Sequence, residues 1–356
     1  VPVSTPTEGA IACASGQVAA PVAPSGVTSA DPLLVVAQGL NQPDDLLYAK
    51  GLLYVGEYGS GRIAMIGPAA QITTLPVLVP EVEGMALIDG TLYAADQQTD
   101  TVVAITGATA APVLRLTPVS GQEGVDGISA QEGNLLVPDS PRGRILVTTT
   151  QGQILRTIGG FDRPTGIWPL TNGGLLVADE YAGRIDLVSA ARGAITSLAK
   201  GIPLADDVAK TPAATVLAIS LQEGALLQVA PGSPTVLARG LNQPQGLTLD
   251  GASNALIAES GAGRVDEVVT TFQPLPAQGV VSLSSGQRLC IGLLRSPTFG
   301  AGVDISPSSA FRTLSQPGTG RLGEILPRPC HTVCRLQVKL SSGTLTEDLT
   351  IAYRAA

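Results

Sequence analysis

Histidine is nearly absent from this sequence of 356 residues, which contains a single one, His331. Residues 1–330 therefore cannot form a Ser-His-Asp triad or supply a histidine general base. Aromatic residues make up 3% of the chain and charged residues 14%, against 44% hydrophobic residues. A chain this poor in charge indicates that part of its surface is covered by a partner.

Long hydrophobic runs are also missing. A membrane-spanning helix needs roughly 18 to 20 apolar residues in a row, and Gly, Pro or a charged residue interrupts every run before that length. We expect no membrane-spanning segment. The sequence begins at Val1, and its first 30 residues lack the basic and apolar regions of a signal peptide. We therefore expect a processed, exported protein that is extracellular, attached to the cell surface or periplasmic.

Basic residues are scarce in the larger part of the chain. Residues 1–269 contain 13 Lys and Arg against 25 Asp and Glu, a net charge of −12, whereas residues 270–356 contain 8 against 4, a net of +4. An acidic body offers no basic patch for phosphates, so nucleic acid is excluded as its partner. The opposite charges favour a protein partner or self-assembly, in which acidic and basic parts of successive copies meet in a head-to-tail oligomer or filament.

A repeat of about 40 residues organises what is present. Residues 40–46, LNQPDDL, return as residues 241–247, LNQPQGL, and looser copies lie between them. The aligned turn positions are Pro43, Val82, Val125, Pro164, Ala205 and Pro244. Each unit contains short apolar runs bounded by Gly, Pro or Asn, without helical periodicity. This period and strand pattern are typical of propeller blades, because each sheet buries its faces only against its neighbours.

The predicted fold is an all-β, six-bladed β-propeller over residues 31–270. In each of the first five units, a fourth apolar run follows the third strand. The fourth strand of the sixth unit is found before the first unit, at residues 33–37. Docking of that N-terminal strand on the last unit would close the ring and leave no open edge. Residues 271–356 read as hairpins, and we expect them to form a small β-sandwich-like accessory domain together with residues 1–30.

All four cysteines lie outside the predicted propeller. An even number in an exported chain favours disulfides. Because the segments before residue 31 and after residue 270 both leave the same blade, we expect Cys13 to bond either Cys330 or Cys334, and Cys290 to bond the other. The accessory domain would then be held by disulfides. The alternative, a metal site at Cys330-His331-Thr332-Val333-Cys334, does not have a usual zinc spacing.

One motif resembles a known family. Residues 177–185, VADEYAGRI, are similar to the signature of NHL-type propeller repeats, and versions stand at residues 55–63, 137–145 and 257–265. The resemblance covers about two thirds of the chain and implies the propeller fold. It leaves the function open, since such propellers serve as lyases, lactonases, sugar binders and scaffolds. The streptogramin lyases and paraoxonase-like enzymes rely on histidine, so the scarcity of histidine counts against them.

A ring of polar residues is predicted at the mouth of the central channel, where each inner strand begins. Its members are Asp44, Glu83, Asp126, Thr165, Asp206 and Gln245. Carboxylates in so narrow a ring repel unless a cation or bound protons relieve them, and oxygen ligands suit Ca²⁺. Glu83-Gly84 and Asp126-Gly127 also resemble the metal-binding acid-Gly positions of gluconolactonase-like hydrolases, with Asp206 as the later acid. We therefore predict a possible Ca²⁺ site at Asp44, Glu83, Asp126 and Asp206.

Structural roles compete with these assignments. The ring acids could cap turns or accept hydrogen bonds from free backbone N–H groups. Thr165, Trp168 and Gln245 are candidate ligand-binding residues, although Trp168 could instead pack between blades. A second acidic column precedes the Gly-rich turns and has an Arg five residues further on in most units; we interpret it as a turn-fixing pair. Its members are Glu57, Asp96, Asp139, Asp179 and Glu259.

Two functions from different classes remain. The first is an exported, non-enzymatic propeller that binds a partner or builds a surface assembly; the missing general base, the apolar composition and the charge split favour it. The second is a Ca²⁺-dependent lactonase- or esterase-like hydrolase, with channel-mouth carboxylates holding the metal and one of them activating water. We favour the first, and so expect no enzymatic activity.

Overall fold

The structure is a computed structural model that describes residues 17–19, 23–27, 33–67, 70–190, 193–211, 214–230, 234–251, 254–268, 273–274, 281–285, 287–295, 304–306, 312–313, 321–325, 329–342 and 345–355. The chain divides into two compact units. One consists of residues 35–249 and 255–266, and the other contains the remaining residues. The predicted domain boundaries at residues 31 and 270 stay a prediction.

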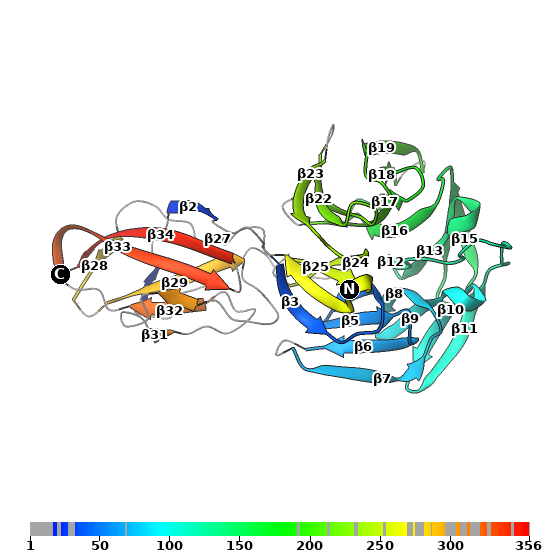
Figure 1. Ribbon diagram of the computed structural model, residues 1–356, viewed down its shortest axis with the longest axis horizontal. Coiled ribbons are helices and arrows are strands. Elements are labelled where there is room, and N and C mark those ends of the chain that lie inside the picture. The colour runs from blue at the N-terminus through cyan, green and yellow to red at the C-terminus, as the bar shows by residue number, and fades with distance from the viewer. Residues whose placement is uncertain are drawn as a thin grey trace. The chain divides into compact units, whose positions relative to one another are not determined.

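The first unit is the predicted six-bladed propeller: the described part of the chain contains six four-stranded sheets arranged as blades (Figure 1). Blade 1 consists of β4 (Pro43–Ala49), β5 (Leu52–Glu57), β6 (Arg62–Ile66) and β7 (Ile72–Leu78). Blade 2 consists of β8 (Val82–Ile88), β9 (Thr91–Asp96), β10 (Thr101–Thr106) and β11 (Thr109–Arg115). Blade 3 consists of β12 (Ser129–Gln131), β13 (Asn134–Asp139), β14 (Arg144–Thr148) and β15 (Ile154–Gly159).

The remaining blades follow the same order, except that the last takes its outer strand from the N-terminal side. Blade 4 consists of β16 (Pro164–Pro169), β17 (Leu175–Asp179), β18 (Arg184–Val188) and β19 (Ile195–Lys200). Blade 5 consists of β20 (Ala205–Lys210), β21 (Val216–Ser220), β22 (Ala225–Val229) and β23 (Thr235–Arg239). Blade 6 consists of β24 (Pro244–Leu249), β25 (Ala255–Glu259), β26 (Arg264–Val268) and β3 (Leu33–Gln38).

The hydrophobic core lies between neighbouring blades. One cluster joins Ile185 of blade 4 to Val208 and Ala218 of blade 5, and equivalent clusters join blades 1 and 2, 2 and 3, and 3 and 4. All five residues of β17 are buried, whereas five of the six residues of β15 are exposed. Burial therefore decreases from the middle strands to the rim, as expected when each sheet buries its faces against its neighbours.

The acids of the second column fix the turns between strands. Asp179 accepts hydrogen bonds from the backbone N–H groups of Asp162 and Arg163, and it pairs with Arg184 at 2.8 Å. Equivalent ion pairs join Asp139 to Arg144 and Glu259 to Arg264. In blades 4 and 6 the Arg also pairs with a buried Asp on the same strand. The interpretation of this column as structural is confirmed for these three acids. Three short 3-10 turns occur nearby, η1 (Gln97–Thr99), η2 (Ser140–Arg142) and η3 (Ser260–Ala262).

The described residues of the second unit form two five-stranded sheets, and each includes one strand from the N-terminal segment. The first contains β1 (Gln17–Ala19), β27 (Gln273–Pro274), β29 (Arg288–Arg295), β31 (Arg312–Thr313) and β32 (Arg321–Ile325). The second contains β2 (Ala23–Val27), β28 (Val281–Leu283), β30 (Asp304–Ser306), β33 (Cys330–Ser342) and β34 (Leu345–Ala355). The expected accessory β domain is therefore present, and strand pairing joins its two chain segments.

The predicted disulfide connectivity is wrong. Cys330 and Cys334 are bonded to each other, with their Cα atoms 6.2 Å apart. Neither can then bond Cys13 or Cys290 as expected; Cys13 itself lies outside the described residues. The prediction rested on both segments leaving the same blade. The pairing of β1 with β29 and of β2 with β34 does join the N-terminal segment to the tail, through backbone hydrogen bonds.

The closing strand provides a test of the ring. Val36 is 4% exposed and its neighbour Val35 is 47% exposed, because successive side chains of β3 point to opposite faces. We expect Val36→Asp to destabilise the propeller by about 3 to 5 kcal/mol, since it buries an unpaired charge. Val35→Asp should change stability by less than about 0.5 kcal/mol. Urea unfolding of both variants measures this, and equal losses would show that β3 does not close blade 6.

Candidate functional site

The inner strands of all six blades converge on a central cavity. In five blades the second residue of the aligned unit is also the second residue of the inner strand, and in blade 3 it lies in the loop before β12: these residues are Asp44, Glu83, Asp126, Thr165, Asp206 and Gln245. All except Thr165 line a cavity of about 100 Å³, as do Asp45 and Asp207. One water needs roughly 10 to 15 Å³ of such space, so the cavity accommodates a small hydrated ion or several waters.

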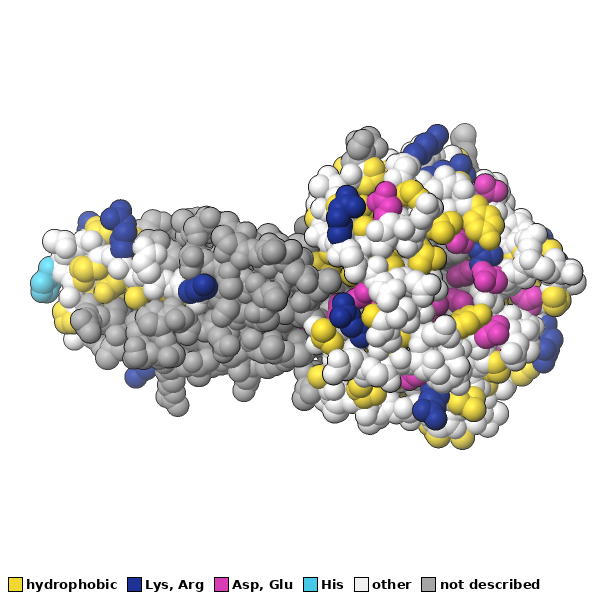
Figure 2. All heavy atoms as spheres, viewed as in Figure 1, with side chains coloured by type: hydrophobic (Ala, Val, Ile, Leu, Met, Phe, Trp, Pro, Cys, Tyr) yellow, Lys and Arg dark blue, Asp and Glu magenta, His cyan; other side chains and the backbone are white. Residues whose placement is uncertain are grey.

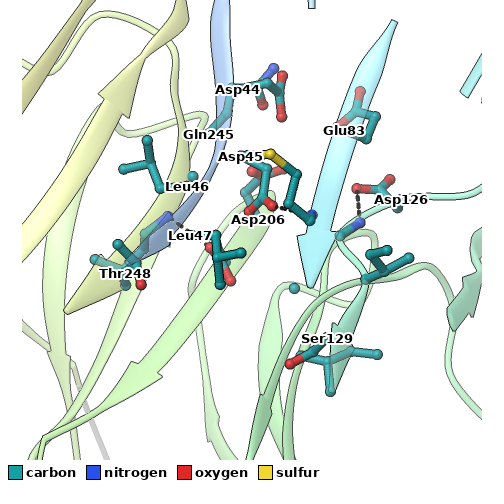
Figure 3. Close-up of a pocket in the computed structure, with 18 of the residues that line it drawn as sticks. Asp44, Asp45, Leu46, Leu47, Glu83, Asp126, Ser129, Asp206, Gln245 and Thr248 are labelled. Carbon is teal, nitrogen blue, oxygen red and sulfur yellow. Dashed lines mark hydrogen bonds between the residues drawn. The ribbon is translucent and has the colours of Figure 1, made fainter. Parts of the chain in front are cut away.

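Carboxylates gather at one end of this cavity. Asp44 and Glu83 stand at one end, Asp45, Asp126 and Asp206 lie nearer the middle, and the hydroxyl residues Ser129 and Thr248 lie toward the other end (Figure 3). In the space-filling view, acidic side chains are visible near the middle of the propeller face (Figure 2). The site is therefore a narrow, negatively charged channel mouth, defined here by Asp44, Asp45, Glu83, Asp126, Asp206 and Asp207.

The third residue of each unit determines how closely adjacent blades approach. Gly occupies this position in four blades and Asp in two, as Gly84, Gly127, Gly166, Gly246, Asp45 and Asp207. A Cβ at Gly84 would collide with the backbone of Ile128 in the next blade, and one at Gly246 would collide with the carbonyl of Asp44. The acid-Gly pattern at residues 83–84 and 126–127 thus has a packing reason that does not depend on a metal.

Asp45 and Asp207 join neighbouring blades by hydrogen bonds. An Asp45 carboxylate oxygen accepts from the Met85 N–H at 2.6 Å, and Asp207 accepts from the Leu247 N–H at 2.7 Å. Burial raises the pKa of Asp207 to about 7, although hydrogen bonds from the Leu247 and Val208 N–H groups act to lower it. Burial, followed by repulsion from Asp207, raises the pKa of Asp45 well above its usual value. These two acids therefore have a structural role within the channel mouth.

Asp44 and Glu83 form a hydrogen-bonded carboxyl pair. Burial raises the pKa of Asp44 to about 7, while hydrogen bonds from Glu83 and Gln245 oppose the rise. Burial and repulsion from Asp44 and Asp126 raise the pKa of Glu83 well above its usual value. Glu83 is then the partner that holds the proton and donates it to Asp44. Gln245, a predicted ligand-binding residue, is thus engaged with the acid cluster.

Arg163 supplies a buried positive charge beside the channel mouth. Its guanidinium is 2.9 Å from Asp126, 3.1 Å from Glu123 and also pairs with Glu180, and it lies over the ring of Tyr181 at 5.5 Å. Burial raises the pKa of Asp126, and Arg163 counteracts this rise. The ion pairs connect blade 4 to the loop before blade 3's inner strand. Asp126 consequently has a counter-charge within the protein.

Asp206 has the least compensated charge of the ring. Burial raises its pKa well above the usual value, and the next largest influences are the carboxylates of Asp126, Asp44, Glu180 and Asp207. These neighbours all disfavour ionisation. A cation placed in the cavity would lower the electrostatic cost of ionising Asp206 more than that of Asp126.

The predicted site residues are brought together only in part. Asp44, Glu83, Asp126, Asp206, Gln245 and Trp168 line the cavity. Trp168 also packs against the core between blades 4 and 5. Thr165 is buried and donates its hydroxyl to the Asp206 carbonyl at 2.6 Å. Within the described residues, no three Asp, Glu, His or Cys side chains are close enough to hold a metal ion as placed. The Ca²⁺ site stays a prediction.

Arg163 is the residue that the sequence comparison of blades did not single out. It stands immediately before Pro164, on the turn, and its three carboxylate partners come from two blades. Blades 1 and 6 have Gln at this position and the other three blades have Glu, Gly or Leu, so the aligned columns give no signal for an Arg there. The scarcity of basic residues gives a weaker signal, since Arg163 is one of only 21 Lys and Arg residues in the chain.

The raised pKa values predict how stability changes with pH. The Asp44 and Asp207 carboxyls lose their protons near pH 4 in the unfolded chain, but only near pH 7 in the folded protein. The folded state therefore loses stability as the pH rises from about 4 to 7. We expect the melting temperature to fall over this range in low salt, and to fall less in Asp44→Asn, which cannot ionise.

Asp89→Asn is the matched control, because Asp89 is exposed at a turn with a φ of 49°, which Asn tolerates. Calorimetry between pH 4 and 8 measures the three profiles. A profile of Asp44→Asn parallel to that of the unmodified protein would contradict the assignment of a raised pKa to Asp44.

Comparisons with known proteins support the fold. No protein-family model matches the chain, and no curated protein matches its sequence. A gluconolactonase structure from Xanthomonas campestris has a TM-score of 0.56 at 12% identity, covering 70% of this chain and 98% of that one. A virginiamycin B lyase from Staphylococcus aureus, a catalytically inactive histidine variant bound to quinupristin, has a TM-score of 0.51 at 15% identity, covering 89% and 98%.

A third similar structure is a chain of a nidogen–laminin complex, with a TM-score of 0.50 at 18% identity, covering 58% of this chain and 84% of that one. Likeness at these identities shows the fold alone. This chain is therefore a six-bladed propeller similar to propellers found both in enzymes and in a protein complex.

Proposed function

We propose that the chain is a non-enzymatic binding protein whose acidic channel mouth contacts a positively charged partner. The observation that supports this most directly is the imbalance at the channel mouth, where six carboxylates line one cavity and Arg163 pairs with one of them. The propeller also lacks histidine, since His331 lies in the accessory unit. In the similar virginiamycin B lyase, the variant described as catalytically inactive replaces a histidine.

A second copy of the chain carries a surface of suitable charge. Arg335 and Lys339 are exposed on β33, four residues apart and therefore on the same face by the period of two, and Arg354 is exposed on β34. Ala352, two residues before Arg354, pairs with Arg335, so all three basic residues lie on one face of the sheet. We therefore propose head-to-tail assembly through the basic face, Arg335, Lys339 and Arg354, and the acidic propeller of the next copy.

The proposed location is outside the cytoplasm: extracellular, on the cell surface or periplasmic. The Cys330–Cys334 disulfide is compatible with an oxidising compartment. No helix in the described ranges has the length and apolar character needed to cross a bilayer.

A Ca²⁺-dependent lactonase- or esterase-like hydrolase is the second candidate. It is favoured by the Asp44–Glu83 carboxyl pair, in which one group holds a proton and the other has a pKa of about 7, near the optimum for general acid–base work. The gluconolactonase likeness adds that this fold supports such an activity in another protein. In this candidate Asp44, Glu83, Asp126 and Asp206 would hold Ca²⁺.

Light scattering at increasing salt tests the assembly. We expect concentration-dependent association at low ionic strength that weakens with added NaCl, because exposed charges are screened within about 10 Å at 0.1 M salt. Arg335→Glu should abolish association, since it reverses a charge at the centre of the basic face. Arg239→Glu makes the same change at an exposed propeller position and should leave association intact. A monomer at all concentrations and salts would overturn the proposal.

Calcium titration separates the two candidates. If the four ring acids hold Ca²⁺, chelation lowers the melting temperature and added Ca²⁺ restores it, because a ligand bound to the folded state stabilises it by mass action. The dissociation constant should be about 10⁻⁴ to 10⁻³ M, as in extracellular calcium modules. Asp206→Asn should remove the response and Asp89→Asn should not. Melting curves indifferent to calcium and chelator would remove the cation site and, with it, the calcium-dependent hydrolase.

A further inference from the structure

The Cys330–Cys334 disulfide closes a small bulge on a single strand. Cys330 is paired with Ala355 and Cys334 with Tyr353, so four steps along β33 are matched by two steps along β34. The three residues between the cysteines, His331, Thr332 and Val333, are all exposed. The bulge therefore presents the single histidine of the chain at the surface, between two cysteines.

This disulfide contributes little to holding the unit together. The stabilisation a disulfide gives grows with the length of the loop it closes, and this loop is among the shortest possible. Beyond the bulge, β33 and β34 remain paired without a break, in eight consecutive pairs from Arg335 with Ala352 to Ser342 with Leu345. The S–S bond can consequently open without loss of the β33–β34 hairpin, unlike a disulfide that joins distant segments.

The two sulfurs differ in access. Cys330 is 5% exposed, whereas Cys334 is only partly buried. Exposed Arg335 stands on the same strand close to the bulge. Its positive charge raises the local concentration of an incoming thiolate, and the more exposed cysteine is the one that the thiolate reaches first. An attack on Cys334, with Cys330 as the leaving group, is therefore the favoured direction.

We propose that the Cys330–Cys334 bulge is a thiol–disulfide exchange site that accepts electrons from a dithiol. One thiolate of the dithiol attacks Cys334 Sγ, the S–S bond breaks, and Cys330 leaves as a thiolate that takes a proton from His331 or water. The second thiol of the donor then attacks the mixed disulfide, and Cys334 leaves and is protonated. The dithiol becomes a disulfide, and two electrons and two protons pass to the cysteine pair. This site is independent of the channel mouth.

Native-state reduction followed by alkylation tests the site. The folded protein is incubated with dithiothreitol, quenched with acid, alkylated with N-ethylmaleimide and digested with trypsin. Arg328 precedes Pro329 and resists cleavage, so Cys330 and Cys334 lie together on the peptide 322–335, separate from the peptides of Cys13 and Cys290. We expect this peptide to gain two alkyl groups without denaturant, while the melting temperature falls by no more than about 5 °C.

Two single-cysteine variants test the order of attack. Cys330→Ser leaves the accessible Cys334 thiol, and Cys334→Ser leaves the buried Cys330 thiol. With glutathione disulfide, Cys330→Ser should form a mixed disulfide several-fold faster than Cys334→Ser. His331→Ala should slow the reduction of the otherwise unmodified protein and leave its melting temperature unchanged. Resistance of the 322–335 peptide to dithiothreitol until the protein is unfolded would overturn the proposal, and so would equal rates in the two cysteine variants.

Discussion

Each blade can bury its two faces only against the blades beside it, and the rest of the structure depends on this constraint. The hydrophobic clusters accordingly join neighbouring blades, as between Ile185 and Val208. A ring of this kind is stable only when its last sheet is complete, which is why β3 crosses from the N-terminal side to blade 6. Closure also forces six inner strands to converge, so residues near the starts of these strands, except Thr165, line the same narrow channel.

The convergence of the inner strands explains why two adjacent acids at the start of a strand have different roles. Asp44 and Asp206 are the second residues of their strands and line the channel, and the next residues, Asp45 and Asp207, also each accept a hydrogen bond from the next blade's backbone. At the equivalent position Gly84 has no room for a side chain. Blades are thus joined in two ways, by close backbone contact at glycine or by a carboxylate. The acidity of the channel mouth is in part a by-product of this joining.

The sequence predicted what repeats and missed what differs between copies. The period near 40, the acid-Arg turn pairs and the displaced strand at residues 33–37 recur or complete a pattern, and the six blades and their closure are confirmed. Arg163 could not be found this way, because its partners Asp126 and Glu180 belong to other columns. The disulfide prediction was wrong for a related reason. It treated Cys330 and Cys334 as anchors for distant segments, while a bulge in β33 lets them bond each other.

The convergence of the inner strands brings several carboxyl groups together, and the groups that compensate them differ from blade to blade. Arg163 already pairs with Asp126, so this ring acid has a counter-charge within the protein. Asp44 and Glu83 share a proton, which removes a second charge. Asp206 has no such compensation among its largest influences, and burial together with other carboxylates raises its pKa well above the usual value. A cation in the cavity would favour the ionised form of Asp206. The proposal of a positively charged partner therefore rests on the surroundings of Asp206 and not on the fold shared with lactonases and lyases.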